Sequence, residues 1–157
     1  MEKMQTGLDD NARKAVADVI NGVLADTYVV YQKTHAYHWN VTGPRFHQLH
    51  VMFEEQYREM WAALDELAER TRALGEYAPA SGEAFAALAS IKSDDKTPPA
   101  AEQMIKNLLA DHETLIRRTR EALGVASEVD DAASEDLLTQ RIQTHEKTAW
   151  MLRAMTQ

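Results

Sequence analysis

The stretch that decides the fold is PRFHQLHVMFEEQYREMWAALDELAERTRAL, residues 44–74. Its apolar side chains recur every three or four positions, which is the spacing of one face of an amphipathic helix. They are Phe46, Leu49, Phe53, Met60, Leu64 and Leu67. Pro44 suits the first turn of a helix, and Gly75 suits the left-handed residue that follows the last turn. The sequence therefore predicts one long helix over residues 44–74 that buries one side.

The same spacing recurs in three other segments, and we expect helices over residues 9–38, 99–123 and 131–155. Their apolar stripes include Val16, Val19, Ile20, Val23, Leu24, Val30, Leu138, Ile142, Ala149 and Leu152. Residues 76–99 differ, because prolines and a Ser-Gly pair bracket one short helix over residues 83–91. No alternation with a period of two is long enough for a sheet. These patterns predict a single all-α domain over residues 1–157, a ferritin-like four-helix bundle with a short extra helix between helices two and three.

The composition narrows the chemistry. Of the 157 residues 45% are hydrophobic and 27% charged, the profile of an ordinary globular domain. The chain has no cysteine, which excludes disulfides, thiolate catalysis and Cys-ligated zinc or iron–sulfur centres. Any metal site must use His, Asp and Glu. No apolar run approaches the ~18–20 residues of a membrane span, and the N-terminus has no signal core, so we expect a cytoplasmic protein, with the nucleoid as an alternative.

The net charge of −8 argues against nucleic acid as a partner. An acidic protein repels polyphosphate unless it carries a local basic arm. The first eight residues hold one Glu and one Lys, and the last seven hold only Arg153 as a charged residue. We therefore expect little or no DNA binding.

Four polar residues form a seam along the predicted second helix: His50, Glu54, Asp65 and Glu69. At ~100° per residue they fall within about 100° of one another around the helix axis. His50 and Glu54 are four residues apart, and so are Asp65 and Glu69. With this i, i+4 spacing, the two members of each pair can reach one ion together. His50 and Glu69 are 19 residues apart, however, which is roughly 28 Å at ~1.5 Å per residue. The two pairs cannot share an ion within one chain.

The seam is symmetric about the middle of the helix, since both His50/Glu69 and Glu54/Asp65 are centred between residues 59 and 60. A two-fold axis at that point, with the helices antiparallel, would set His50 opposite Glu69 and Glu54 opposite Asp65 of a second copy. Two-fold dimers are the commonest oligomers. The spacing predicts two equivalent metal sites between subunits, with His38 as a fifth ligand. The alternative is a solvated helix face without a metal.

The remaining histidines carry weaker signals. His112 and His145 lie on apolar stripes, where a hydrogen-bonded core histidine is the expected role. His35 and His47 lie one turn from His38 and His50, as auxiliary metal groups or as packed or exposed side chains. No histidine has Glu or Asp three residues before it, so the Glu-x-x-His pattern of a di-iron centre inside one bundle is absent.

Residues 33–57, KTHAYHWNVTGPRFHQLHVMFEEQY, together with Asp65-Glu-Leu-Ala-Glu69-Arg70, resemble the Dps family, the DNA-binding proteins from starved cells. The resemblance covers the whole chain. It implies a dodecameric hollow shell that oxidises Fe(II), preferably with hydrogen peroxide, and stores Fe(III) for iron homeostasis and protection from oxidative stress. It also implies a ferroxidase centre between subunits, with ligands His38, His50 and Glu54 from one and Asp65 and Glu69 from its mate.

The resemblance suggests three further roles. Trp39, beside the centre, would donate an electron during catalysis, with packing alone as the alternative. Asp131 and Asp136 match carboxylates that line three-fold iron-entry pores, with capping of the fourth helix as the alternative. Zinc is a substitute for iron at such ligands. The competing functions are a nucleoid-binding protective protein and a helical oligomer that binds metal without catalysis.

Overall fold

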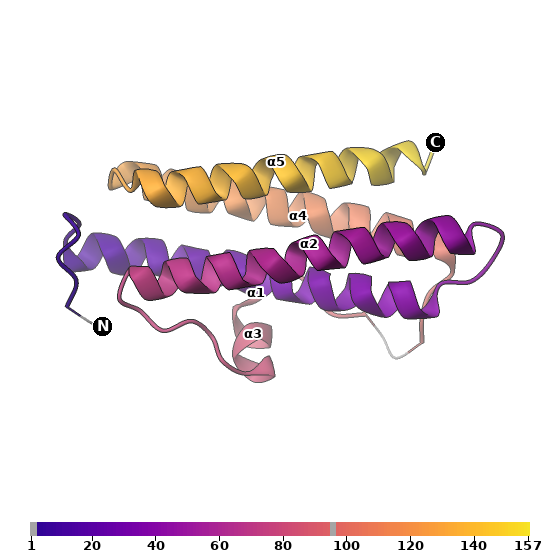
Figure 1. The fold of residues 1–157 in the computed structure, drawn as a ribbon, viewed down its shortest axis with the longest axis horizontal. Helices are drawn as coiled ribbons and strands as arrows, with labels where there is room; N and C mark the ends of the chain where they lie inside the picture. The colour runs from indigo at the N-terminus through magenta and orange to yellow at the C-terminus, as the bar shows by residue number, and fades with distance from the viewer. Residues whose placement is uncertain (1–2, 95–96) are drawn as a thin grey trace.

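The computed structural model of the chain describes residues 3–94 and 97–157, and within them every regular element is a helix. The elements are α1 (Asp10–Asn40), α2 (Phe46–Ala73), α3 (Gly82–Leu88), α4 (Ala101–Glu128) and α5 (Ala132–Ala154). Four long helices lie side by side and the short α3 stands outside them (Figure 1). The predicted all-α bundle with one extra helix is confirmed. Residues 1–2, at the N-terminus, and residues 95–96, in the predicted connection between helices two and three, lie outside the described residues.

The order of the helices follows from their connections. The turn after α1 is short, so α2 returns antiparallel beside it, whereas the long connection through α3 crosses the bundle and α4 runs parallel to α2 (Figure 1). Helix α5 then returns antiparallel to both. Two ion pairs set the register of α2 against α5: Arg70 Nη2 lies 2.7 Å from Asp131 Oδ1, and Arg141 Nη2 donates to Glu59 Oε2 at 3.0 Å.

The two predicted helix ends at glycine had different outcomes. Gly75 adopts φ +93°, and the amides of Gly75 and Glu76 donate back to the carbonyls of Arg72 and Thr71, so the left-handed cap is confirmed. The predicted end at Gly124 is wrong, because α4 continues to Glu128. A glycine inside a helix costs about 1 kcal/mol, which is outweighed here by continued burial of the apolar stripe beyond it.

The core lies between the four long helices. Most predicted core positions of α2 are fully buried, among them Leu49, Phe53 and Leu67. Leu64 is only partly buried, and Phe46, the first residue of α2, is 45% exposed. No described helix combines the length and the apolar character that crossing a membrane requires.

A buried carboxylate anchors the crossing connection to the bundle. Asp26 of α1 is fully buried and accepts hydrogen bonds from the amides of Ser90 and Ile91, at 2.7 and 2.9 Å, and from Arg118 of α4 at 2.7 Å. Gly22 makes room for that arginine, since a Cβ there would lie 2.5 Å from Arg118 Nη2. The connection is thus held on the side of α1 and α4, which leaves much of the outer face of α2 uncovered.

Candidate metal centre between α1 and α2

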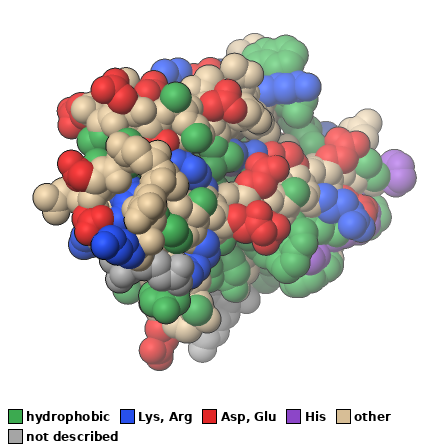
Figure 2. Space-filling model, turned by 60° about the vertical axis from the view of Figure 1, so that its left-hand side comes forward, with side chains coloured by type: hydrophobic (Ala, Val, Ile, Leu, Met, Phe, Trp, Pro, Cys, Tyr) green, Lys and Arg blue, Asp and Glu red, His purple; other side chains and the backbone are tan. Residues whose placement is uncertain are grey.

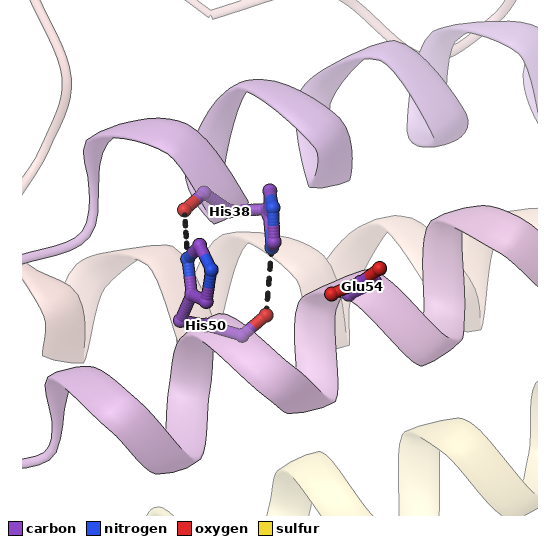
Figure 3. A group of neighbouring side chains, drawn as sticks. All are labelled: His38, His50 and Glu54. Atoms are coloured by element: carbon purple, nitrogen blue, oxygen red, sulfur yellow. Dashed lines mark hydrogen bonds between the residues drawn. The ribbon is translucent and has the colours of Figure 1, made fainter.

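The end of α1 and the beginning of α2 bring three potential ligands together. Ligand atoms of His38, His50 and Glu54 all lie within 4.8 Å of one another (Figure 3). Two ligands of one ion, each bound at about 2.1 Å, lie up to about 4 Å apart, so small side-chain rotations suffice to share an ion. No other trio of His, Asp or Glu ligands in residues 3–94 and 97–157 lies this close. The sequence predicted these three residues as neighbours, and the structure places them so.

Hydrogen bonds between the two histidines hold each ring in the tautomer that can bind a metal through Nε2. His38 Nδ1 donates to the backbone carbonyl of His50 at 2.7 Å, and His50 Nδ1 donates to the carbonyl of His38 at 2.8 Å (Figure 3). A carbonyl oxygen only accepts, so both Nδ1 atoms carry the hydrogen and both Nε2 atoms keep a free lone pair. Metal-bound histidines are held in this way by a hydrogen bond from their second nitrogen. The rings stack with centroids 3.8 Å apart.

Glu54 is oriented and kept charged by its neighbour. Arg58, one turn further along α2, donates to Glu54 Oε1 from Nε at 2.8 Å and lies 2.7 Å from it through Nη2. This hydrogen bond is the main cause that lowers the pKa of the Glu54 carboxyl, with the charges of Arg58, His38 and His50 acting in the same direction. Both contacts use Oε1, so Oε2 remains for a cation.

Asp65 and Glu69 do not join this group within one chain. Both are exposed on α2, and the continuous helix separates Glu69 from His50 by roughly 28 Å. Between the two ends of the seam stands Trp61, which is 64% exposed. Asp65 lines a surface hollow together with Leu24, Tyr28, Trp61 and Phe85. Whether a second copy brings Asp65 and Glu69 to His50 and Glu54 stays a prediction.

An aromatic cluster adjoins the centre. The ring of His35 stacks on Tyr57 with centroids 3.8 Å apart and lies 4.1 Å from the ring of Trp39, which is itself 65% exposed. Burial, followed by the charges of His38 and Arg58, lowers the pKa of His35. His35 is therefore packed among rings, and the catalytic role of Trp39 remains a prediction. Tyr57 was not among the predicted site residues, although its spacing of seven from His50 puts it on the same helix face.

The predicted pore residues lie at the α4–α5 turn. Asp131 is 4% exposed, caps α5 through the amide of Ser134 at 3.3 Å, and accepts two hydrogen bonds from Arg70 at 2.7 and 2.8 Å. This is the capping alternative, and a pore role for Asp131 would require these bonds to open. Asp136 is exposed and accepts from Gln140. Figure 2 turns this end of the bundle forward and shows acidic and basic side chains interspersed over the face.

The predicted core histidines are confirmed. His112 and His145 are each 1% exposed, and their Nδ1 atoms lie 3.0 Å apart between α4 and α5. His47, the other histidine of uncertain role, is exposed at the start of α2.

Known proteins match the chain over nearly its whole length. A family model described as a ferritin-like domain matches residues 17–157. DNA protection during starvation protein 2 of Bacillus anthracis is 36% identical over 90% of this chain and 96% of its own length. An uncharacterised low-temperature-induced protein of Nostoc is 41% identical over 98% of this chain and 87% of its own length. The crystal structure of a Vibrio cholerae Dps protein, described as a member of the ferritin-like diiron-carboxylate superfamily, has a TM-score of 0.94 and 31% identity, covering 100% of this chain and 98% of that one.

Proposed function

Because this chain belongs to the Dps family of ferritin-like proteins, we propose that it is a ferroxidase whose iron sites lie between two-fold-related subunits. Membership of the family supports iron binding, iron storage and protection in general. The observation that carries the finer proposal is the incomplete centre of His38, His50 and Glu54, together with the matching carboxylates of Asp65 and Glu69 on the same helix.

The donor set suits iron as a substrate. Imidazole nitrogens and carboxylate oxygens accept both Fe(II) and Fe(III). Three ligands from one subunit leave positions for two more from its mate and for an oxidant. With hydrogen peroxide, two Fe(II) ions each give up one electron, and the peroxide takes both electrons with two protons to become two water molecules. Because the oxygen–oxygen bond receives two electrons, no hydroxyl radical is released. Zn(II) takes the same ligands and is the expected competitor.

The exposed face of α2 supports the dimer that the site needs. Trp61 lies close to the proposed two-fold axis between residues 59 and 60 and is 64% exposed, beside an apolar hollow that Phe85 and Tyr28 line. Exposed apolar surface of this kind marks an interaction site. An antiparallel copy of α2 crossing there would cover Trp61 and place both ends of the two seams together. We propose that such dimers assemble into a shell of twelve chains that holds Fe(III).

We propose a cytoplasmic protein that binds little or no DNA, since a net charge of −8 repels polyphosphate. Asp136 is proposed to line the iron-entry pore, with Asp131 joining it only when its bonds to Arg70 open.

The first test is iron oxidation by the apoprotein. After mixing with Fe(II) and peroxide, the unaltered protein should show a rapid rise of ferric absorbance, and gel filtration should show an iron-loaded shell of about twelve chains. His50→Ala and Glu69→Ala should each abolish the fast phase. Glu55→Ala is a matched control, because it removes an acid from the same helix outside the seam, and this variant should keep the fast phase. Metal binding without peroxide consumption would instead support a non-catalytic oligomer.

The second test asks whether the site is shared. A dimer of one His50→Ala and one Glu69→Ala subunit has two unlike sites. One site keeps all its ligands, and the other lacks both His50 and Glu69. If the two variants are unfolded and assembled together at random, half of the dimers are mixed and about a quarter of the sites are restored. Recovery of roughly that fraction of the fast phase supports the shared centre. No recovery in mixed assemblies would contradict it.

A further inference from the structure

A second polar cluster lies inside the bundle, away from the α1–α2 centre. Arg141 of α5 binds Glu59 of α2 through both terminal nitrogens, one of them at 3.0 Å, and its Nη2 lies 3.2 Å from His145 Nε2. His145 Nδ1 in turn lies 3.0 Å from Nδ1 of His112 on α4. Four side chains from three helices thus form one continuous chain of hydrogen bonds.

The positions of the hydrogen atoms in this hydrogen-bonded series follow from Arg141. A guanidinium only donates, so His145 Nε2 must accept from Arg141. A neutral His145 then carries its hydrogen on Nδ1 and donates it to Nδ1 of His112. His112 must therefore carry its own hydrogen on Nε2. That Nε2–H group has no partner, although His112 is 1% exposed.

Gln56 of α2 lies at the same level of the bundle. It is three residues before Glu59, and His145 is four residues after Arg141. Glu59 pairs with Arg141, and α2 and α5 run antiparallel. Going back from Glu59 to Gln56 and forward from Arg141 to His145 therefore moves about one helical turn in the same direction along the bundle. Gln56 is 7% exposed, and neither its amide nitrogen nor its amide oxygen has a partner.

The cluster and the neighbouring Gln56 hold several buried polar atoms without a partner. Gln56, His112 and Arg141 together hold four buried side-chain nitrogen or oxygen atoms that lack a hydrogen-bond partner. Buried polar groups without a partner are rare in folded proteins, and ordered water is a common way to satisfy them. We propose that Gln56, His112 and Arg141 form an internal binding site for water, holding one or two molecules between α2, α4 and α5.

The hydrogen-bonding pattern selects this ligand over ions. The site offers three donors, His112 Nε2–H, the Gln56 amide and Arg141 Nε–H, and one acceptor, Gln56 Oε1. Water both accepts and donates, and it makes two to four such bonds when buried. A metal ion is excluded, because His112 Nε2 carries a hydrogen in place of a lone pair. An anion has no uncompensated charge to bind, because Glu59 already neutralises Arg141. The inference is independent of the proposed ferroxidase activity.

The experiment is a crystal structure of the assembled protein at a resolution that resolves ordered water, with anomalous data from crystals soaked in Fe(II) or Zn(II). We expect water density within hydrogen-bonding distance of His112 Nε2 and the Gln56 amide, without an anomalous peak. Solid-state NMR of ¹⁵N-labelled protein should show His112 protonated on Nε2 and His145 on Nδ1. A direct bond between Gln56 and His112 with no density between them, an anomalous peak, or the opposite tautomers would each overturn the proposal.

A pair of variants gives a second measurement. Gln56→Leu removes one side of the site, so the water at His112 should be lost or displaced and the ¹⁵N resonance of His112 Nε2 should shift. Gln48→Leu changes an exposed glutamine of the same helix and should leave that resonance unchanged. An identical His112 signal in the Gln56→Leu variant and the unaltered protein would overturn the role of Gln56.

Discussion

Acid should destabilise the bundle through its buried histidine pair. Burial, and then the positive charge of Arg141, lowers the pKa of His112 from 6.5 to about 4. Burial, His112 and Arg141 also lower the pKa of His145. The groups that face the pair are thus Arg141 on α5 and, through it, Glu59 on α2. Both histidines stay neutral in the folded protein at pH values where the unfolded chain already binds protons.

The sign and the size of the effect follow from this difference. The free energy of unfolding has its full value above about pH 6.5 and falls progressively as the pH falls towards 4. The reason is that His112 binds a proton in the unfolded chain but stays neutral in the folded protein over this range. At about 1.4 kcal/mol per pH unit, the lowered pKa of His112 corresponds to a loss of about 3 kcal/mol per subunit between these limits. His145 adds to the loss in the same direction.

The assay compares denaturant unfolding of the metal-free protein from pH 7.5 to 4, at one fixed subunit concentration, with that of His112→Phe. The variant lacks the titrating imidazole, so its free energy of unfolding should fall less steeply with decreasing pH, whatever its stability at neutral pH. His47→Gln changes an exposed histidine and should follow the unaltered protein. Equal slopes for His112→Phe and the unaltered protein between pH 6.5 and 4 would refute the reasoning.

Four other changes test the packing and the metal centre. Gly22→Ala should lower the free energy of unfolding, measured by urea denaturation, by about 1–3 kcal/mol, since the added Cβ would lie 2.5 Å from Arg118 Nη2. Gly124 has open space around it, so Gly124→Ala should instead raise the free energy of unfolding by up to about 1 kcal/mol. Asp26→Ala removes the acceptor of Arg118 and of two backbone amides, so the free energy of unfolding should fall by about 3 kcal/mol. Limited proteolysis should then cut the connection before α4, and resistance equal to that of the unaltered protein would contradict this. Arg58→Ala should raise the pKa of Glu54, because Arg58 is the main cause of its lowering, and calorimetry should show that Fe(II) binding fails at a higher pH; an unchanged pH midpoint would count against it.

The candidate site shows how far spacing alone carries a prediction. The sequence placed His50 and Glu54 on one face of a helix and His38 at the adjacent turn, and the structure brings these three together. It did not predict the reciprocal bonds between each histidine ring and the other's backbone carbonyl, because these depend on how closely α1 and α2 pack at their junction. Arg58 was also missed as the group that orients Glu54.

Periodicity determined the helices, the fold class and the symmetric seam on α2, because the spacing of apolar and polar residues along one helix is a local property. Tertiary structure decided what that spacing leaves open: that Gly124 stays inside α4, that Phe46 is exposed, and that Asp131 bonds to Arg70. It also decided that His112 and His145 meet and that Gln56 is buried at their level. The physical reason is register, since the partner of a side chain depends on how far one helix is shifted against the next. That shift is set by the packing of the whole core and by ion pairs between residues far apart in the chain.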